Sequence, residues 1–478
     1  MFLKDRRTKI VCTLGPSSNT EERIKELIQN GMDMARINFS HGSHEEHAGV
    51  IELINKISAM YEIPVPILAD LQGPKIRVGN MKEGAQHLES GTYVTLTSDN
   101  EKEGTSEVVP IDYSKLSEDA EAGDRILMDD GLLELKVVKI EGSEIIAQVI
   151  VGGKLKSRKG VNLPGVKLSM SSLTKKDIED LEFALEQQVD YIAMSFVRSA
   201  NDIQDVISRV RASGSEAGII AKIEKPEAVG VIDDIIEEAN AIMVARGDLG
   251  IEIASERVPL VQKKIIDRCR KAGKPVITAT QMLESMMVNA RATRAESSDV
   301  ANAVLDGTDA VMLSGETAAG EYPIEALKAM DKICSSVEKN ASHIYNSLGY
   351  KKPEWKEKQI IESLAYSCVM LAENVDAKAI STITHSGSTA RRIAKFRPQV
   401  PLVAFTESDK VRRQLALVWG VRPVKIDEIF DTDKSVRLME EYLKDNGMVD
   451  LGDRVIIATG MPIAKRGRTN MIKVSTIK

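Results

Sequence analysis

Charged side chains that suit phosphate and metal chemistry follow two apolar runs in the middle of the chain. Lys222-Ile223-Glu224 comes directly after the run 219–221, and Arg246-Gly247-Asp248 comes directly after the run 241–245. Carboxylates such as Glu224 and Asp248 are the oxygen ligands that Mg²⁺ prefers, and two of them leave positions for water. A lysine beside such a metal suits a transferring phosphoryl group. The alternative is that these charges form ordinary ion pairs at a protein surface.

Both apolar runs are predicted to be buried parallel strands, because a helical segment from about Pro226 to Glu238 separates them. A strand, a helix and a second strand in this order place the two strands side by side in one sheet. Side chains alternate along a strand, so Lys222 and Glu224 point to the same side. The ammonium and the two carboxylates are therefore expected to converge at one edge of the sheet.

The same alternation of strand and helix extends over most of the chain and predicts eight strands. They are expected at 9–14, 33–38, 65–70, 191–196, 219–224, 241–245, 275–279 and 310–313. Eight β/α units favour a closed parallel barrel, an α/β fold of the TIM-barrel type with its active site at the carboxyl ends of the strands. An open doubly wound sheet is the alternative. Ser17, Ser18 or Asn19 is expected to cap the first helix, at about 21–30.

The pattern changes at two places, which predicts two further domains. Residues 73–171 contain short alternating segments and a turn at 141–143, typical of a β-rich domain with hairpins. Because this segment interrupts the barrel pattern, we expect an inserted, hinged lid. Residues 346–478 contain a second α/β pattern, with strands at 379–383, 402–405 and 455–459. The barrel domain is then expected to comprise 1–72 and 172–345.

Polar residues at the ends of the predicted barrel strands extend the candidate site. They are Arg36, Asn38, Ser40, Asp70, Thr278, Thr280, Ser314 and Glu316, in addition to the two clusters already described. Cations, carboxylates and hydroxyls gathered at one end of a barrel suit a phosphorylated substrate held with a metal ion. Ser314 and Glu316 are expected to support the site by packing rather than to touch the substrate.

Composition limits the classes of partner. The chain has 478 residues, a net charge of −7 and no basic tract, which argues against nucleic acid. No apolar run is long enough to span a bilayer, and residues 1–10 lack the apolar segment of a signal peptide. The four cysteines show no C-x-x-C spacing and are expected to be reduced thiols. These features favour a cytoplasmic protein without a membrane partner.

Several short motifs, in this order along the chain, resemble those of the pyruvate kinase family. They are RINFSHG at 36–42, GVNLPG at 160–165, KIE at 222–224, MVARGDLG at 243–250, TATQM at 278–282 and LSGET at 313–317. The match spans essentially the whole chain. The resemblance implies a central barrel, a mobile lid inserted after the third strand, and a C-terminal regulatory domain. It also implies the glycolytic transfer of the phosphoryl group of phosphoenolpyruvate to ADP, giving pyruvate and ATP.

The resemblance assigns roles to residues of the candidate site. Glu224 and Asp248 would bind Mg²⁺, or Mn²⁺ in its place. Lys222 and Arg36 would stabilise the phosphoryl group in transit. The substrate carboxylate would be held by the backbone of Gly247 and Asp248 and by the hydroxyl of Thr280. Thr280 and ordered water would relay a proton to the enolate. The expected catalytic residues are thus Lys222, Arg36 and Thr280.

Binding of the nucleotide is implied for a turn in the barrel and for two basic residues of the lid. These residues are Asn38, Phe39, Ser40, His41, Arg77 and Lys159. A lid carrying Lys159 would exclude water and limit hydrolysis. His41 has no partner in the sequence, so a structural place in its turn is the alternative to catalysis.

The expected monovalent-cation region departs from the potassium-dependent members of the family. Its matching positions are Asn38, Ser40, Asp70, Leu71 and Lys75. Leu71 stands where that subgroup has a threonine oxygen, and Lys75 stands where it has a glutamate. An ammonium can replace a monovalent cation electrostatically. We therefore expect activity without K⁺. The alternative is that Lys75 points to solvent and backbone oxygens still hold K⁺.

A hydroxyl-rich segment of the C-terminal domain is the expected effector site. It follows a strand and opens a helix, where backbone N–H groups can bind an anion. By resemblance it would take a phosphorylated small-molecule effector, on Thr384, His385, Ser386, Gly387, Ser388, Thr389, Lys465 and Arg468. An ordinary helix cap is the alternative. The resemblance also implies an allosteric homotetramer.

Two other functions share parts of this residue set. A Mg²⁺-dependent barrel lyase or aldolase acting on an enolpyruvate would use the carboxylates but would not need Arg77, Lys159 or the lid. A catalytically inactive regulatory paralogue is the third class, although Lys222, Glu224, Asp248 and Thr280 are all present. An assay that separates ADP-dependent pyruvate formation from ADP-independent C–C cleavage distinguishes the three.

Overall fold

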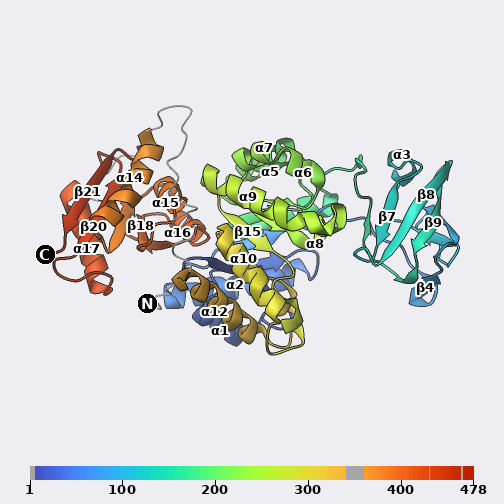
Figure 1. The fold of residues 1–478 in the computed structure, drawn as a ribbon, viewed down its shortest axis with the longest axis horizontal. Coiled ribbons are helices and arrows are strands. Elements are labelled where there is room, and N and C mark those ends of the chain that lie inside the picture. Colours follow the sequence, from blue (N-terminus) through green and yellow to red (C-terminus); the bar gives the residue numbers. More distant parts are fainter. Residues whose placement is uncertain (1–5, 341–359, 430, 464–466) are drawn as a thin grey trace.

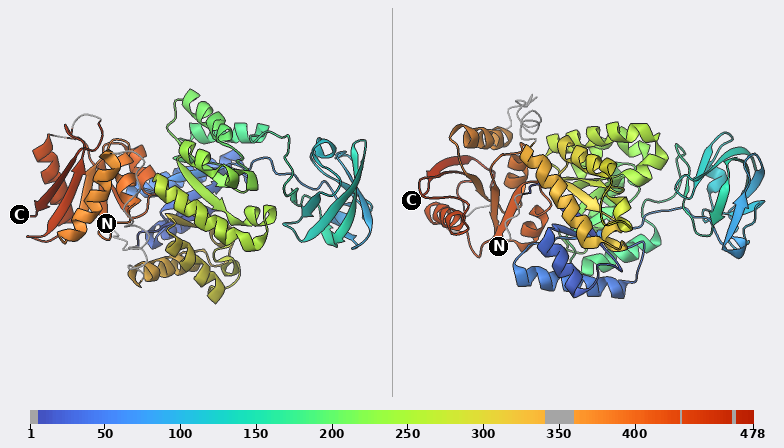
Figure 2. Two further views of the ribbon diagram at one scale, coloured as in Figure 1. Left: turned by 45° about the horizontal axis from the view of Figure 1, so that its top comes forward. Right: turned by 60° about the horizontal axis from the view of Figure 1, so that its bottom comes forward.

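The computed structural model describes residues 6–340, 360–429, 431–463 and 467–478, and these form three units in a row. In Figure 1 a C-terminal α/β unit lies at one end, a barrel in the middle and a β-rich unit at the other end. The two further views in Figure 2 show the same order, with the β-rich unit joined to the barrel by thin connections.

Eight parallel strands close into the central barrel within the described residues. In chain order they are β1 (Lys9–Leu14), β2 (Met34–Asn38), β3 (Ile67–Asp70), β12 (Tyr191–Met194), β13 (Gly218–Ile223), β14 (Ala241–Ala245), β15 (Val276–Ala279) and β16 (Ala310–Leu313). The order around the barrel is β1-β16-β15-β14-β13-β12-β3-β2. Closure confirms the predicted barrel and excludes the open sheet. The strands are aliphatic and mostly buried, as expected when both faces of a sheet are covered.

Helices follow the strands and form the outer layer. They are α1 (Glu21–Asn30), α2 (His44–Tyr61), α4 (Lys175–Glu186), α5 (Ala200–Ala212), α6 (Pro226–Gly230), α7 (Ile232–Glu238), α8 (Arg246–Glu252), α9 (Val258–Ala272), α10 (Arg294–Asp306), α11 (Gly315–Ala318) and α12 (Pro323–Asn340). Reciprocal capping boxes open α2, α4, α5 and α10 and fix where these helices begin.

One local prediction is wrong, and one is refined by the structure. The cap of α1 is Thr20, whose side chain accepts a hydrogen bond from the backbone N–H of Arg23, rather than Ser17, Ser18 or Asn19. Its position directly before the first helical residue gives it the cap geometry. The helical segment expected from about Pro226 to Glu238 is present, but it divides into α6 and α7 because the backbone at Val231 leaves helical geometry (φ −113°, ψ 29°).

The β-rich unit contains two sheets and a core of its own. A six-stranded sheet has the order β11-β7-β8-β9-β5-β6, and a two-stranded sheet pairs β10 with β4. The strands are β4 (Ala85–Leu88), β5 (Tyr93–Thr97), β6 (Val108–Pro110), β7 (Arg125–Met128), β8 (Leu133–Glu141), β9 (Glu144–Val151), β10 (Gly153–Lys156) and β11 (Val161–Asn162), with the short helix α3 (Leu116–Asp119) and a 3₁₀ turn at Lys82–Gly84. The hairpin turn predicted at 141–143 joins β8 to β9.

The C-terminal unit is a five-stranded sheet of order β19-β18-β17-β20-β21, in which β21 alone is antiparallel to its neighbour. Its elements are α14 (Ile360–Asn374), β17 (Ala379–Ile383), α15 (Ser388–Ala394), β18 (Leu402–Thr406), α16 (Asp409–Leu415), β19 (Val421–Lys425), α17 (Thr432–Asp445), β20 (Arg454–Thr459) and β21 (Met471–Thr476). The domain boundary expected near 345 lies outside the described residues, and the other boundaries stay proposals.

The C-terminal unit packs against the amino ends of the barrel strands. Lys9, at the start of β1, donates to the carbonyl of Val421 at 2.9 Å. Arg397 pairs with Asp309, which precedes β16, at 3.0 Å. The β-rich unit leaves the barrel from the opposite end, after β3. The carboxyl ends of the barrel strands therefore face the β-rich unit, and the amino ends face the C-terminal unit (Figure 1).

Within the described ranges no helix has the length and apolarity needed to cross a bilayer. All four cysteines, Cys12, Cys269, Cys334 and Cys368, are buried, and none of them forms a disulfide. Burial raises the pKa of the Cys334 and Cys368 thiols to about 12, so neither is a reactive thiolate at neutral pH.

Candidate active site

Lys222 lies at the centre of the carboxyl end of the barrel. Its ammonium nitrogen is 3.0 Å from Glu224 Oε1 and 3.2 Å from Asp70 Oδ1, and it donates to Ser195 Oγ at 2.7 Å. Lys222 and Glu224 lie two residues apart and share one side, as strand alternation predicts. Only 12% of the Lys222 side chain is exposed. Burial lowers the pKa of Lys222, but the charges of Asp70 and Glu224 outweigh this effect and hold it above its ordinary value.

Arg36 stands beside Lys222, on the other side of the same carboxylate. Its Nε lies 2.6 Å from Asp70 Oδ2, and its Nη1 donates to Thr13 Oγ1 at 2.9 Å. Asp70 is buried, which opposes ionisation, yet the charges of Lys222 and Arg36 hold its pKa below the ordinary value. The two cations are thus fixed side by side by one buried carboxylate at the ends of β2, β3 and β13.

Glu224 and Asp248 follow neighbouring strands and are close enough to interact. Burial raises the pKa of Glu224, Lys222 opposes the rise, and the negative charge of Asp248 adds to it. The backbone N–H of Phe196 donates to Glu224 Oε2 at 2.7 Å and fixes that carboxylate. Asp248 is more open, with 29% of its side chain exposed, and the Lys75 ammonium lies 3.9 Å from its Oδ1.

This carboxylate pair fits a divalent cation. A buried carboxylate whose charge is disfavoured by a neighbouring carboxylate, as that of Glu224 is, gains when a cation binds beside it. Within the described ranges, His, Cys, Asp and Glu form no group of three or more arranged to bind a metal. A metal here would therefore have two protein carboxylates and would take its other ligands from water or substrate, as Mg²⁺ does.

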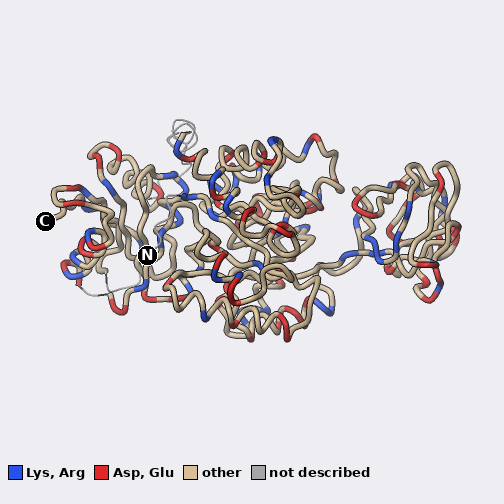
Figure 3. The backbone as a smooth tube through the Cα atoms, turned by 90° about the horizontal axis from the view of Figure 1, so that it is seen from below, with Lys and Arg blue, Asp and Glu red and all other residues tan. Residues whose placement is uncertain are grey.

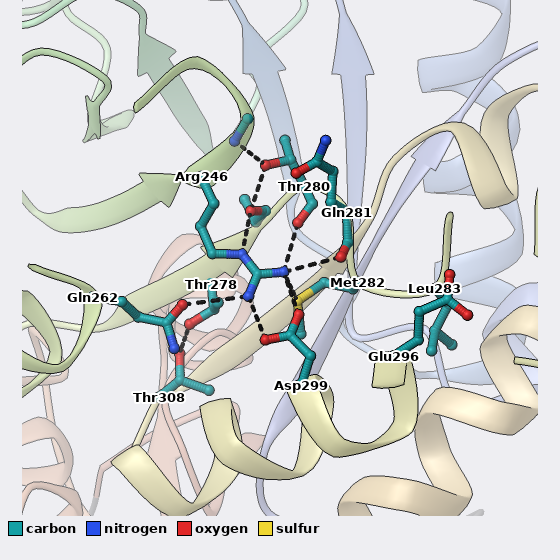
Figure 4. A network of polar contacts seen from close by, with 12 residues as sticks. Arg246, Gln262, Thr278, Thr280, Gln281, Met282, Leu283, Glu296, Asp299 and Thr308 are labelled. Carbon is teal, nitrogen blue, oxygen red and sulfur yellow. Dashed lines mark hydrogen bonds and ion pairs between the residues drawn. The ribbon is translucent and has the colours of Figure 1, made fainter. Parts of the chain in front are cut away.

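Thr280 and Gly247 meet at the next two strand ends. The backbone N–H of Gly247 donates to Thr280 Oγ1 at 2.8 Å, and the Thr280 hydroxyl donates to the carbonyl of Ala279 at 2.7 Å. Thr280 adopts a φ of +65°, which is rare for a β-branched residue. Arg246, directly before Gly247, contacts this turn through its guanidinium group (Figure 4).

An open cleft of about 720 Å³ lies over these strand ends and admits a small charged substrate. Its lining includes Lys75, Gly247, Asp248 and Thr280. Ser314 and Glu316 line its far side. The buried Glu316 carboxylate accepts the backbone N–H groups of Ser314 at 2.7 Å and Leu283 at 3.0 Å. This is the supporting place predicted for Glu316.

The residues expected to bind the nucleotide come from two units. Asn38 Oδ1 accepts the N–H of Ser40 at 3.2 Å, Phe39 is buried, and the His41 side chain is exposed. In the β-rich unit Arg77 Nη1 donates to the carbonyl of Arg158 at 3.2 Å. Lys159 lies 2.8 Å from Asp129 Oδ1. Arg77 and Lys159 are thus held within their own unit, apart from the barrel turn that holds Asn38–His41.

Oxygens of Leu71 and Asp70, in the expected monovalent-cation region, already have partners. Leu71 is buried, and its carbonyl accepts the Ser195 hydroxyl at 2.7 Å. Both carboxylate oxygens of Asp70 face cations, as described above. Lys75 lies beside Asp248 rather than in bulk solvent, with 31% of its side chain exposed.

The effector segment lines a pocket of about 320 Å³ in the C-terminal unit. Thr384, His385, Ser386, Ser388 and Thr389 contribute to it, and Gly387 adopts a φ of +76° that opens α15. The Gly387 N–H donates to Thr384 Oγ1 at 2.9 Å, while the hydroxyls of Thr389 and Thr469 lie 2.7 Å apart. Among described residues, His385 Nε2 is buried with no hydrogen-bond partner. Arg468 is exposed outside the lining, and Lys465 lies outside the described residues.

Sequence reasoning missed Ser195 and Phe196. Ser195 joins the Lys222 ammonium to the carbonyl of Leu71, and the Phe196 N–H holds Glu224. Both follow β12 directly, so the rule that found the other strand ends also applies to them. The residue type hid them, because a lone hydroxyl and a backbone N–H do not stand out beside charged groups.

Comparisons with known proteins agree over nearly the whole chain. The family model for the pyruvate kinase barrel domain matches residues 5–327, and the model for the pyruvate kinase α/β domain matches residues 362–475. Pyruvate kinases of Staphylococcus aureus strains MRSA252 and USA300 are each 46% identical over 474 residues, covering 99% of this chain and 80% of each relative. The crystal structure of a pyruvate kinase from Cryptosporidium parvum superposes with a TM-score of 0.92 at 38% identity, covering 99% of this chain and 96% of that one.

These matches favour phosphotransferase chemistry over the lyase and aldolase alternative. The barrel and the C-terminal unit agree with the same family. The chain belongs to the pyruvate kinase family and transfers the phosphoryl group of phosphoenolpyruvate to ADP, giving pyruvate and ATP.

Proposed function

We propose that Lys222 neutralises charge on the phosphoryl group during its transfer, with Arg36 beside it. The observation that carries this proposal is the position of the Lys222 ammonium, 3.0 Å from Glu224 and 3.2 Å from Asp70 at the mouth of the barrel. Phosphoryl transfer needs positioned positive charge more than covalent chemistry. Asp70 supplies that positioning, because one buried carboxylate holds both cations.

Glu224 and Asp248 are the proposed ligands of Mg²⁺, or of Mn²⁺ in its place. Their mutual repulsion and the exposure of Asp248 to the cleft support this assignment. A bound divalent cation supplies Lewis-acid stabilisation of the enolate oxygen of pyruvate. The Phe196 N–H and the Lys222 ammonium orient Glu224, so the carboxylate stays in place.

The backbone N–H groups of Gly247 and Asp248 and the Thr280 hydroxyl are the proposed holders of the substrate carboxylate. The Gly247 N–H lies 2.8 Å from Thr280 Oγ1, so the two groups adjoin at neighbouring strand ends, which supports a shared role. Thr280 with ordered water is the proposed proton relay to the enolate carbon. A threonine hydroxyl alone is too weak an acid for that step.

The nucleotide is proposed to bind between Asn38–His41 of the barrel and Arg77 and Lys159 of the β-rich unit, which acts as a lid. Figure 3 shows basic segments along the connection between the two units and on the side of the β-rich unit turned toward the barrel. Positive charge on that side suits the phosphates of ADP. Closure of the lid would exclude water from the reaction.

Activity without K⁺ is proposed, with the Lys75 ammonium in place of the ion. Three observations support it. Lys75 lies 3.9 Å from Asp248 Oδ1, Leu71 has no side-chain oxygen, and its carbonyl is bonded to Ser195. A fixed ammonium costs no ion binding, so it serves in the absence of salt.

Allosteric activation is proposed through the pocket at Thr384–Thr389, with a phosphorylated small molecule as the effector. The hydroxyls, the helix start at Gly387 and the unpaired His385 Nε2 among described residues support an anionic ligand. Arg468 and Lys465 are the proposed closing residues. The proposed assembly is a homotetramer, which light scattering of the purified chain tests. The cytoplasm is the proposed location, since none of the four cysteines forms a disulfide.

Lys222→Met tests the central assignment. It removes the charge and keeps a similar length, so kcat should fall by about a hundredfold or more while phosphoenolpyruvate still binds. Lys271→Met is the matched control, because that side chain is 67% exposed on α9. Near-native turnover of Lys222→Met would end the assignment. Pyruvate formation must depend on ADP, which also separates this enzyme from a lyase and from an inactive paralogue.

A further inference from the structure

Arg246 donates hydrogen bonds to three consecutive backbone carbonyls on the turn that carries Thr280. Its Nε donates to the carbonyl of Ala279 at 3.3 Å, and its Nη2 donates to the carbonyls of Thr280 at 2.8 Å and Gln281 at 3.2 Å. Figure 4 shows the guanidinium at the centre of this network, with the turn on one side. Three consecutive carbonyls therefore depend on one planar cation.

The Asp299 carboxylate and the Gln262 side-chain amide hold the Arg246 guanidinium from the opposite side. Asp299, on α10, accepts a hydrogen bond from Arg246 Nη1 at 2.8 Å, and its other oxygen lies 2.7 Å from Nη2. This is the bidentate geometry that arginine forms with a carboxylate. Gln262, on α9, accepts Nη1 at 3.4 Å. Only 9% of the Arg246 side chain is exposed. The group is thus held in one orientation by two helices of the outer layer.

The turn that Arg246 contacts has an unfavourable backbone conformation. Thr280 and Gln281 have φ values of +65° and +53°, and neither is glycine. L-residues seldom adopt such values, and a β-branched residue does so least readily. Backbone in this state persists only where surrounding groups hold it. Arg246 Nη2 donates hydrogen bonds to the carbonyls of these same two residues.

We propose that Arg246 is a positioning residue, which holds Thr280 in its left-handed conformation and so directs its hydroxyl at Gly247. Arg246 precedes Gly247 in the chain, and the Gly247 N–H donates to Thr280 Oγ1 at 2.8 Å. The ends of β14 and β15 are therefore joined twice, once by the Arg246 guanidinium and once by the Gly247 N–H. This inference rests on the proposed role of Thr280 toward the substrate carboxylate and enolate.

The test begins with Arg246→Lys. Lysine keeps the charge but cannot donate to several carbonyls and a carboxylate in one plane. We expect kcat to fall by about tenfold to a hundredfold, because a small displacement of a positioned group has that cost. The Mg²⁺ concentration for half-activation should change little, since Glu224 and Asp248 remain. Arg268→Lys is the matched control, a surface residue of α9 paired with Asp233 and 47% exposed.

A double-mutant cycle separates positioning from general support of the fold. If Arg246 acts through Thr280, Arg246→Lys lowers kcat in the unmodified enzyme and has little further effect in Thr280→Ala. If the losses that Arg246→Lys and Thr280→Ala cause in kcat, expressed as activation free energies, are additive, the inference is overturned. Thermal unfolding of each variant shows whether the protein still folds. If Arg246→Lys does not fold, Asp299→Asn loosens the same guanidinium and replaces it in the cycle.

Glycine at position 281 gives an independent readout of the backbone. Glycine adopts positive φ without strain, so Arg246→Lys combined with Gln281→Gly should recover part of the lost kcat. No recovery would overturn the proposed backbone mechanism. If kcat falls in Thr280→Ala but not in Arg246→Lys, this inference fails while the proposed role of Thr280 stands. Unaffected Thr280→Ala would defeat the proposed role of Thr280 and the inference with it.

Discussion

The Lys410 ammonium of the C-terminal unit lies 3.5 Å from Asp190 Oδ1 of the barrel. Lys410 also lines the effector pocket, and Asp190 directly precedes β12, whose other end leads to Ser195 and Phe196. Asp190 also receives Arg413 Nε at 2.8 Å, and its neighbour Tyr191 donates to the carbonyl of Gln414 at 3.0 Å. The pocket proposed for the effector is therefore joined through α16 to the strand that leads to the partners of Lys222 and Glu224.

An anion in that pocket competes with Asp190 for Lys410. Asp190→Asn removes the competing charge, so inorganic phosphate should bind at least about twofold to fivefold more tightly, since even exposed ion pairs have that worth and this pair is largely buried. Lys410→Met should weaken phosphate binding. Isothermal titration with phosphate measures both, with Lys425→Met as a control outside the pocket lining. Equal affinity in all variants would place the anion elsewhere.

Replacing Ser386 and Thr389 together by Ala tests the effector segment. Both residues line the pocket, and the Thr389 hydroxyl meets Thr469 at 2.7 Å. We expect activation by phosphorylated small molecules to be lost, because the hydroxyl donors are gone. Basal turnover should be kept, since the pocket lies at the opposite end of the barrel from Lys222. Activation that survives in the double variant contradicts the proposed site.

Asp248→Asn tests the metal site. An amide oxygen replaces a charged ligand, so the Mg²⁺ concentration for half-activation should rise by about tenfold or more. Steady-state kinetics at saturating phosphoenolpyruvate and ADP measure it, with Asp233→Asn as a control on the surface of α7. A half-activation concentration equal to that of the unmodified enzyme would show that Asp248 is not a ligand.

Lys75→Glu tests independence from K⁺. The unmodified enzyme should be active without K⁺, and the variant should lose about tenfold or more in kcat/KM, a factor equal to roughly 1.4 kcal/mol. K⁺ should restore only part of the loss, because Leu71 still offers no side-chain oxygen. Ionic strength is kept constant with a tetraalkylammonium salt. Strict dependence of the unmodified enzyme on K⁺ would refute the proposal.

Asp70→Asn should change stability and its dependence on pH. The variant leaves Arg36 and Lys222 without their shared carboxylate, at a cost of about 3 kcal/mol in unfolding free energy at neutral pH. Lys222 and Arg36 hold the Asp70 pKa below its ordinary value, so the folded state binds this proton less readily than the unfolded state. Stability from Asp70 is therefore present above the unfolded pKa of about 3.9 and is lost as pH falls through the folded pKa. Urea unfolding from neutral pH down to about pH 3 should show a shallower decline for the variant; parallel curves would contradict this account.

Much of the barrel could be predicted because its strands are continuous aliphatic runs. The bounds of β1, β14 and β16 agree with the prediction residue for residue. Short polar strands gave no such signal. Ala85–Leu88 and Gly153–Lys156 pair only with each other, and neither was predicted. Their structure comes from pairing across the β-rich unit rather than from local pattern.

Residue types at strand ends predicted the charged groups of the site but not their partners. Lys222, Glu224 and Asp248 could be placed by alternation and by the carboxyl-end rule. The contacts of Arg246 reach Thr280 and Asp299, which are distant in sequence, so only the folded chain reveals them. The same holds for Asp190 and Arg413, which belong to different units.

The insertion after β3 also bears on how this chain folds. The barrel closes only when β3, ending at Asp70, pairs with β12, starting at Tyr191. A flexible connection of that length carries a loop-closure entropy cost that grows with the logarithm of its length. The β-rich unit has its own core, and Arg77 bridges to Gly160 near its two ends. If this unit folds first, it turns the long connection into a short one. Defects in its core should accordingly slow barrel formation and expose the barrel strands to aggregation, even where every residue of the active site is intact.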